Sequence, residues 1–176
     1  MMQHLLSHQH RKIALISGPI SVSANRHRHE TWKRSLRNAG IDAPDEYFLS
    51  GPLTSDSGYL CAQKLLMLGA SRPTAIFAAN FLIMTGVLKA MRQAGLQCPA
   101  DIELTCADDS EWLDVFDPPI STVIQPSYEM GKQSAELLLK RMNQPKGTRE
   151  LILLKPKLRI RVQDFRRQCP VGDQTA

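Results

Sequence analysis

The sequence predicts an α/β fold in which a mainly parallel sheet is flanked by helices. Short apolar runs alternate with amphipathic helical stretches, and this alternation is typical of strand–helix–strand crossovers. An internal echo supports it, because RNAGIDAPDEYFLSG at 37–51 recurs as RQAGLQCPADIELTC at 92–106. Both copies contain a helix end, an Ala-Gly stop, a proline-containing loop and a strand, so we expect a repeated unit.

Four strands and three helices are expected before residue 110. The strands are 13–18, 46–51, 74–80 and 101–108, and the helices are 28–39, 56–68 and a third between residue 80 and Gly95. The third helix carries an apolar stripe at i, i+3 and i+4 spacing, formed by Ile83, Met84, Val87, Leu88 and Met91. Gly40, Gly69 and Gly95 are expected to end the three helices.

The pattern changes after residue 118. A strand is expected at 120–125, followed by a helix that opens at Pro126 and runs to about Met142. Residues 149–165 alternate in polarity, and Pro156 divides them into two expected strands. The residues after 165 have the character of a loose tail.

The bulk composition indicates one soluble domain. The chain has 176 residues, 43% of them hydrophobic, and a net charge of +5. The first residues contain neither a signal-peptide pattern nor a membrane span, and the basic stretches fit solvated faces better than a nucleic-acid surface. The four cysteines lack CxxC spacing, so reduced core thiols and a cytoplasmic location are expected rather than a zinc site.

Polar residues gather where the predicted strands end. Ligands of open parallel sheets bind outside the carboxyl ends of the strands. The first expected strand is followed by the loop that leads to Arg28, and the second by the loop 51–55. The third ends at Asn80, next to Phe81, and the fourth ends at Asp108, next to Asp109. A guanidinium, an amide and carboxylates suit a polyhydroxylated or anionic small molecule. Asn80 could equally be an ordinary strand-end cap.

Catalytic and metal-binding alternatives have less support in the sequence. Asp108 and Asp109 could hold Mg²⁺ for phosphoryl transfer, but no lysine lies in the strand-end loops. Glycine-rich phosphate loops and hydrolase motifs are missing. The five histidines are expected at solvated positions, away from any nucleophile. We therefore expect no catalytic residues, no metal site, no cofactor and no enzyme activity.

The residues singled out so far resemble one family. HRKIALISGP, SANRHRHETWKRSLRNAGI, RPTAIFAANFLIMTGVLKAMRQAGLQCPADIEL and DDSEWLDVFDPPISTVIQPSYEMGKQSAELLLKRM match, in order, four blocks of the effector-binding core of the lactose-repressor/galactose-repressor (LacI/GalR) transcription factors. The resemblance covers about residues 4–163. It implies a two-lobed, periplasmic-binding-protein-like domain that closes on an effector, usually a sugar, sugar derivative or nucleobase.

The resemblance also assigns roles to particular residues. Arg28 matches the loop arginine that grips the effector, Asn80 and Asp108 match strand-end ligands, and Gln125 lies where the chain crosses between lobes. Phe81 stands where the family usually has an acid, and Trp112 is expected near the cleft or a dimer face. The ligand-binding set predicted from sequence is Arg28, Asn80, Phe81, Asp108, Trp112 and Gln125.

The same resemblance implies a domain layout and partners. Residues 1–165 would form the effector domain, with 4–118 and 149–163 in the second lobe, 120–142 as a remnant of the first, and 166–176 as a tail. A repressor role, a small polar effector such as a sugar or sugar acid, and a homodimer are implied. DNA would be read through a helix-turn-helix headpiece absent from this chain, and no membrane is involved.

Two other functions stay open at this point. A fragment of a periplasmic-type sugar-binding protein would share the fold, and a Mg²⁺-dependent phosphotransfer or receiver-like domain would use Asp108 and Asp109. In the acid-rich stretch CADDSEWLDVFDPP (106–119), Asp108 is the residue expected to touch a ligand and Asp109 its structural neighbour. The remaining acids are expected in a solvated or partner-facing turn. The apolar stripe of the helix at 126–142 is expected to mediate association.

Overall fold

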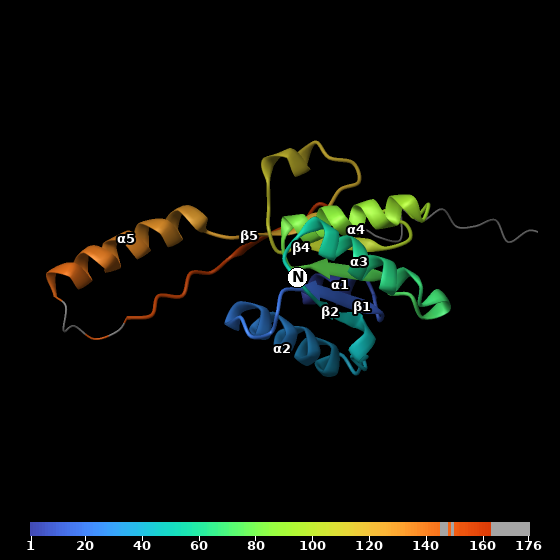
Figure 1. The fold of residues 1–176 in the computed structure, drawn as a ribbon, viewed down its shortest axis with the longest axis horizontal. Coiled ribbons are helices and arrows are strands. Elements are labelled where there is room, and N and C mark those ends of the chain that lie inside the picture. Colours follow the sequence, from blue (N-terminus) through green and yellow to red (C-terminus); the bar gives the residue numbers. More distant parts are fainter. Residues whose placement is uncertain (145–147, 149, 163–176) are drawn as a thin grey trace, which may run out of the picture.

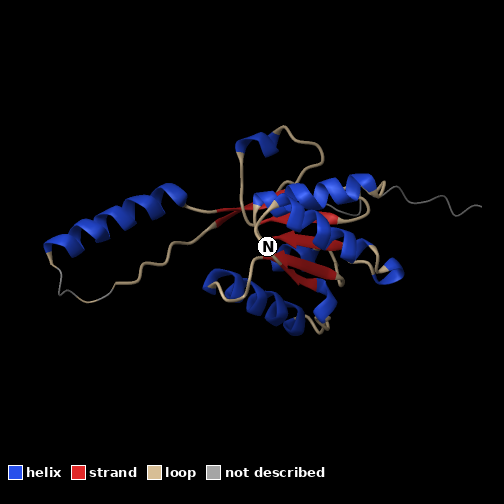
Figure 2. Cartoon of the chain, viewed as in Figure 1, coloured by secondary structure: helices blue, strands red, loops and turns tan. Residues whose placement is uncertain are grey.

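The computed structural model describes residues 1–144, 148 and 150–162, and these fold around a six-stranded sheet (Figures 1 and 2). The strands are β1 Ile13–Ser17, β2 Phe48–Ser50, β3 Ala75–Ala78, β4 Glu103–Cys106, β5 Ser121–Ile124 and β6 Lys157–Arg159. Their order is β2-β1-β3-β4-β5-β6, and β6 alone among them pairs antiparallel. The expected mainly parallel α/β sheet is confirmed.

Helices cover both faces of this sheet. The covering helices are α1 Met2–Ser7, α2 Ser23–Asn38, α3 Ser55–Leu66 and α4 Phe81–Gln93, and a fifth helix, α5 Ser127–Asn143, lies away from the sheet. α3 and α4 pack together on one face, whereas α1 and α2 lie on the other (Figure 1). The chain moves one way from β1 to β2 and the other way from β2 through β3 to β4, so right-handed crossovers place α2 opposite α3 and α4.

Local sequence signals fix the helix ends. The Asn80 side chain accepts a hydrogen bond from the Ile83 amide at 2.9 Å and caps α4, and Thr54 caps α3 in the same way. Gly40 and Gly95 adopt positive φ directly after α2 and α4, the left-handed conformation that glycine permits at a helix end. The helix stops expected at Gly40 and Gly95 are confirmed, whereas α3 ends at Leu66, three positions before the expected stop at Gly69.

Several boundaries differ from those expected. α2 begins at Ser23 rather than near residue 28, so Arg28 lies within the helix and not in a loop. The polar stretch Ser-Ala-Asn-Arg-His carries no apolar periodicity, which is why its helical character was missed. Each strand is also shorter than its apolar run, because a strand extends only as far as its backbone pairs with a neighbouring strand. β1 and β3, for example, pair only from Ile13↔Ala75 to Ile16↔Ala78.

The last expected elements are partly wrong. Residues 150–155 form no strand, and only Lys157–Arg159 pairs, with β5. β5 itself joins the sheet beside β4, so the strand expected with the first lobe is a member of this sheet. Residue 149 and the expected tail at 166–176 lie outside the described residues.

α5 extends away from the sheet and its helices (Figure 1). None of its residues is buried, and Leu138, Leu139 and Met142 are all exposed. Its apolar side chains therefore contact no core in the described part of the chain. Among the helices of the described residues, none has the length and apolar character needed to cross a membrane.

Backbone contact between α3 and α4 sets the packing on one face. A Cβ at Gly86 would lie 2.0 Å from the Ser55 carbonyl oxygen and 2.5 Å from the Tyr59 amide nitrogen. A Cβ at Gly58 would lie 2.4 Å from the Ile83 carbonyl oxygen. Because the obstructing atoms are backbone, they cannot move aside without separating the helices.

Replacing Gly86 by alanine should therefore lower the free energy of unfolding by about 1–3 kcal/mol. The matched control is Gly131→Ala in α5, where an added Cβ meets nothing within 4 Å. Urea unfolding followed by circular dichroism measures both. Equal midpoints for Gly86→Ala and the parent would contradict the close approach of α3 and α4.

Candidate functional site

Polar side chains follow one edge of the sheet in the order of the strands. The chain after β1 carries Asn25 and Arg28, β3 leads to Asn80, β4 leads to Asp108, and β5 leads to Gln125. The order β2-β1-β3-β4 reverses direction between β1 and β3, and a doubly wound sheet opens a crevice at such a switch point. We call this row of side chains the carboxyl-edge row.

Asn25 ties Arg28 to the end of β1. Asn25 is buried, its Nδ2 donates to the Pro19 carbonyl at 3.2 Å, and its Oδ1 accepts from Arg28 Nη1 at 3.1 Å. A Cβ at Gly18 would stand 2.3 Å from Asn25 Nδ2, so a glycine is needed for this approach. The hydrogen bond from Arg28 to Asn25 thus fixes the guanidinium. Arg28 borders a hollow of about 620 Å³ that Phe77, Val123 and Leu158 also line.

Asn80 fills the capping role that the sequence left open. Besides capping α4, its Nδ2 donates to the Leu53 carbonyl at 3.3 Å, which joins the loop after β2 to the end of β3. Its side chain is half-buried. Asn80 therefore positions the centre of the row and does not line the hollow that Arg28 borders.

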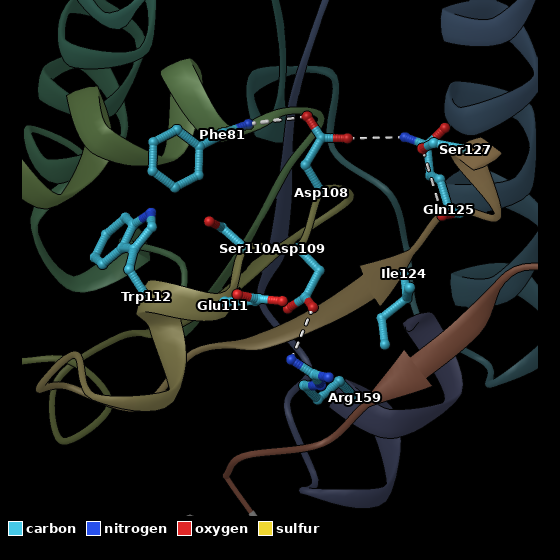
Figure 3. A pocket seen from close by; sticks show the side chains of 10 residues that line it. All are labelled: Phe81, Asp108, Asp109, Ser110, Glu111, Trp112, Ile124, Gln125, Ser127 and Arg159. Carbon is cyan, nitrogen blue, oxygen red and sulfur yellow. Dashed lines mark hydrogen bonds and ion pairs between the residues drawn. The ribbon is translucent and has the colours of Figure 1, made fainter. Parts of the chain in front are cut away.

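Asp108 lies between an amide side chain and a helix N-terminus (Figure 3). Its Oδ1 accepts from Gln125 Nε2 at 2.8 Å and its Oδ2 accepts from the Phe81 amide at 3.3 Å. The positive end of the α4 dipole favours a carboxylate there. Each oxygen keeps lone-pair capacity for a further donor.

A hollow of about 590 Å³ opens beside Asp108 (Figure 3). It is lined by Phe81, Asp108, Asp109, Ser110, Glu111, Trp112, Ile124, Gln125, Ser127 and Arg159. Trp112 is 39% exposed and meets Phe81 edge to face, with ring centroids 5.2 Å apart. An indole beside carboxylate and amide groups suits a ligand with both hydroxyls and apolar ring faces.

The Asp109 side chain points away from Asp108 and is engaged in a hydrogen bond and ion pairs within the protein. Its Oδ1 accepts from the Thr122 hydroxyl at 2.5 Å and lies 3.0 Å from Arg161 Nη1, and its Oδ2 lies 3.1 Å from Arg159 Nη1. Burial alone would raise the pKa of Asp109, but the Thr122 hydroxyl and the two arginines lower it below its ordinary value. These contacts give Asp109 the structural role that the sequence suggested.

The two adjacent aspartates therefore form no joint magnesium site. In the described ranges, the side chains that cluster in a set of three with metal-binding atoms are His4, His8 and Glu103, at the opposite end of β4. Asp114 likewise contacts both arginines, whereas Glu111 and Asp117 are exposed. The expected solvated turn is a short 3-10 helix, Glu111–Asp114, anchored by the buried Leu113.

The structure brings together four of the residues predicted from sequence: Phe81, Asp108, Trp112 and Gln125 line one hollow. Arg28 and Asn80 stand further along the same edge. Sequence reasoning missed Arg159 and Ser127 at this hollow, because the pairing of β5 with β6 that brings Arg159 there has no local signal. The expectation of solvated histidines is wrong for His10, which is buried, and for His4 and His8, which are largely covered.

Comparisons with known proteins place this geometry in context. A model of the periplasmic binding protein-like domain matches residues 2–162. The ribose operon repressor of Escherichia coli strain K12 is 33% identical over 154 residues, which cover 88% of this chain and 46% of the repressor. The chain thus spans about half the length of that relative.

Solved structures agree with this match. The crystal structure of a LacI transcriptional regulator from Bacillus cereus subsp. cytotoxis has a TM-score of 0.86 and 30% identity, over 91% of this chain and 56% of that one. A LacI family regulator from Enterococcus faecium with bound ribose has a TM-score of 0.76 and 29% identity, and the match covers 93% of this chain and 60% of that one.

The pairing of Asp109 predicts a pH-dependent stability. A lowered pKa contributes stability that is present above the ordinary carboxyl range and is lost as the pH falls through the lowered value. Asp109→Asn should reduce the free energy of unfolding at pH 7 by about 1–3 kcal/mol and flatten this acid slope. Asp114→Asn, which removes a half-exposed partner of the same arginines, should cost less. Urea unfolding between pH 7 and pH 3 measures both, and equal slopes for Asp109→Asn and the parent would refute the role.

Proposed function

We propose that this chain, which belongs to the LacI/GalR family of regulators through its periplasmic-binding-protein-like effector domain, binds a small sugar at the carboxyl-edge row. The observation that carries the proposal is the order of the row itself. Arg28, Asn80, Asp108 and Gln125 follow successive strands of one sheet and face the edge where such sheets take ligands.

The chemistry of the row favours a polyhydroxylated ligand. Asp108 accepts hydrogen bonds and Gln125 both donates and accepts, which matches vicinal hydroxyls that do both. Arg28 adds a fixed positive charge, so a sugar acid or sugar phosphate also fits. Trp112 and Phe81 offer aromatic surface to the apolar face of a sugar ring. One relative is named a ribose operon repressor and one structural neighbour holds ribose, so a pentose is the first ligand to test.

In this proposal the chain regulates transcription and catalyses no reaction. Its relatives are repressors, and the described edge residues offer binding groups with Asp109 committed to arginines. A sugar would change the shape of the effector domain, and a DNA-binding segment elsewhere in the regulator would respond. Such a regulator works in the cytoplasm. α5, which buries nothing here, would complete the opposing lobe.

A homodimer is part of this proposal. The segment after Asp109 and the end of α4 border a hollow of about 800 Å³ lined in part by Leu88, Met91, Phe116 and Pro118. Val115 beside it is 88% exposed, and Trp112 packs on Phe116 with centroids 4.8 Å apart. An apolar surface that combines a helix with an adjacent turn suits an isologous contact.

Removing the Asp108 charge tests the binding site. Trp32 is 1% exposed and Trp112 is 39% exposed, so sugar binding should alter mainly the Trp112 emission. Asp108→Asn should weaken ribose affinity roughly 10- to 100-fold, since a hydrogen bond to a charged group is lost. Asp42→Asn, an exposed loop aspartate, is the matched control. Titration with ribose, glucose and a sugar phosphate distinguishes ligand classes, and unchanged affinity in Asp108→Asn would exclude the site.

Sedimentation velocity tests the dimer. Val115→Asp should convert a dimer into a monomer, because it places a charge in an apolar contact. Leu139→Asp in α5, 60% exposed in the parent, should leave the dimer intact. If Leu139→Asp alone gives the monomer, association runs through α5 and the α4 surface is excluded.

A further inference from the structure

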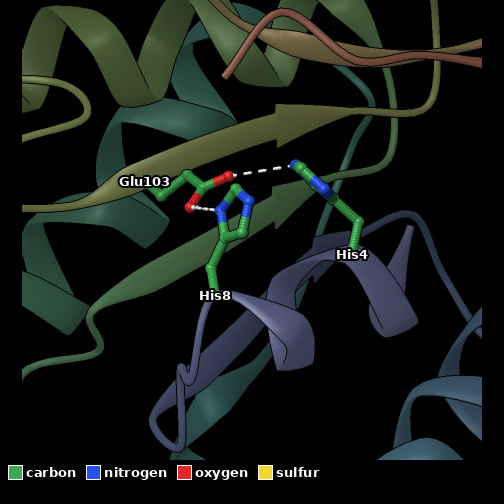
Figure 4. A group of neighbouring side chains, drawn as sticks. All are labelled: His4, His8 and Glu103. Carbon is green, nitrogen blue, oxygen red and sulfur yellow. Dashed lines mark hydrogen bonds and ion pairs between the residues drawn. The ribbon is translucent and has the colours of Figure 1, made fainter. Parts of the chain in front are cut away.

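A second polar cluster lies at the start of β4, near the amino edge of the sheet. Glu103, the first residue of β4, is fully buried, and two histidines from α1 and its C-terminal end face it (Figure 4). His4 Nε2 lies 3.3 Å from Glu103 Oε1 and His8 Nδ1 lies 2.8 Å from Glu103 Oε2. His10 Nε2 lies 2.9 Å from the same Oε2.

The surroundings of the carboxylate favour its ionised form. Burial alone would raise the pKa of Glu103, but contacts from His10, His4 and His8, with the charge of His8, lower it to about 2. An isolated buried carboxylate is strongly unfavourable, so it requires a positive partner close by. A bound cation can supply that charge.

Hydrogen bonds leave this cluster incomplete. His4 Nε2 and Glu103 Oε1 are both shielded from solvent, and neither has a hydrogen-bond partner among the described residues although they face each other. Leaving such atoms unsatisfied costs about 1–3 kcal/mol each. A group located between the two atoms would satisfy both.

The spacing of the three side chains fits a metal ion. His4 in α1 and His8 at its C-cap are four positions apart, the spacing that lets two histidines of metal-binding helices bind one ion. One nitrogen of each histidine and one oxygen of Glu103 lie within 4.8 Å of one another. Zinc bonds of about 2.0–2.2 Å in a tetrahedron place ligand atoms about 3.3–3.5 Å apart, so a small inward movement closes the site.

We propose that His4, His8 and Glu103 bind one transition-metal ion of the zinc class, a site that the sequence did not predict. Two imidazoles and a carboxylate are the borderline donors that such ions prefer, and a water completes the shell. His10 acts from outside it: Nδ1 lies 2.8 Å from Thr74 Oγ1 and Nε2 holds Glu103 Oε2, which orients the carboxylate. The ion would fasten α1 to β4.

Zinc titration of the whole chain tests the site. Metal-free protein is titrated with ZnCl₂ by calorimetry, and its melting temperature is measured with and without zinc. The parent should bind one ion per chain and melt at a higher temperature with zinc, because the folded state alone assembles the three ligands. His4→Gln and His8→Gln should each weaken zinc binding by about tenfold or more and lose the melting shift. His27→Gln, an exposed histidine on α2 outside the cluster, should behave as the parent.

Cobalt gives a readout that stability alone cannot imitate. Co²⁺ in the parent should show visible absorption bands of a low-coordinate nitrogen and oxygen site, absent in His8→Gln. If Glu103→Gln does not fold, the histidine variants and this spectrum decide the result. No zinc binding by the parent, equal binding by His8→Gln, or a cobalt–thiolate band from the cysteines would overturn the proposal and leave a hydrogen-bonded cluster only.

Discussion

The parallel pairing of β1, β3 and β4 is the constraint on which the rest of this structure depends. Every residue of β1 and β4 is buried, because helices cover the sheet on both faces. Polar ligand-binding groups cannot lie along such strands without losing water, so they collect where the strands end. The carboxyl-edge row follows from that limit, and its order reproduces the order of the strands rather than the order of any motif.

The same constraint explains how much of the fold the sequence could predict. Helix periodicity and the glycines at 40 and 95 are local signals, and they gave the C-terminal ends of α2 and α4 correctly, whereas α3 ends at Leu66, three positions before Gly69. Strand bounds depend on neighbours far along the chain, so they were too long. Residues 150–155 show the limit most clearly, because alternating polarity makes a strand only where a partner edge is present. In the described residues, the C-terminal segment pairs with β5 only at Lys157–Arg159.

The sequence could predict those residues of the candidate site whose exposure depends only on their position relative to the end of a strand. Asp108 lies two positions after the end of β4 and faces the edge. Asp109, one position later, turns toward Arg159 in the last strand and Arg161 just after it. Those arginines lie some fifty positions away, and only the β5–β6 pairing brings them near. The prediction for the N-terminal histidines was wrong for the same reason, because their partner Glu103 is more than ninety positions away. Their polarity indicated solvent exposure, whereas the fold places them against a buried carboxylate.

Glu103 and Asp108 lie near opposite ends of β4 and show two ways of keeping a carboxylate in a folded protein. Asp108 keeps contact with an open hollow, so its two hydrogen bonds can be exchanged for those of a ligand at little cost. Glu103 has no such access, and any imbalance of charge around it must be met inside the protein. The proposed sugar site thus lies where a ligand can exchange, whereas the proposed ion would lie at the amino edge and stabilise the sheet without competing with the sugar.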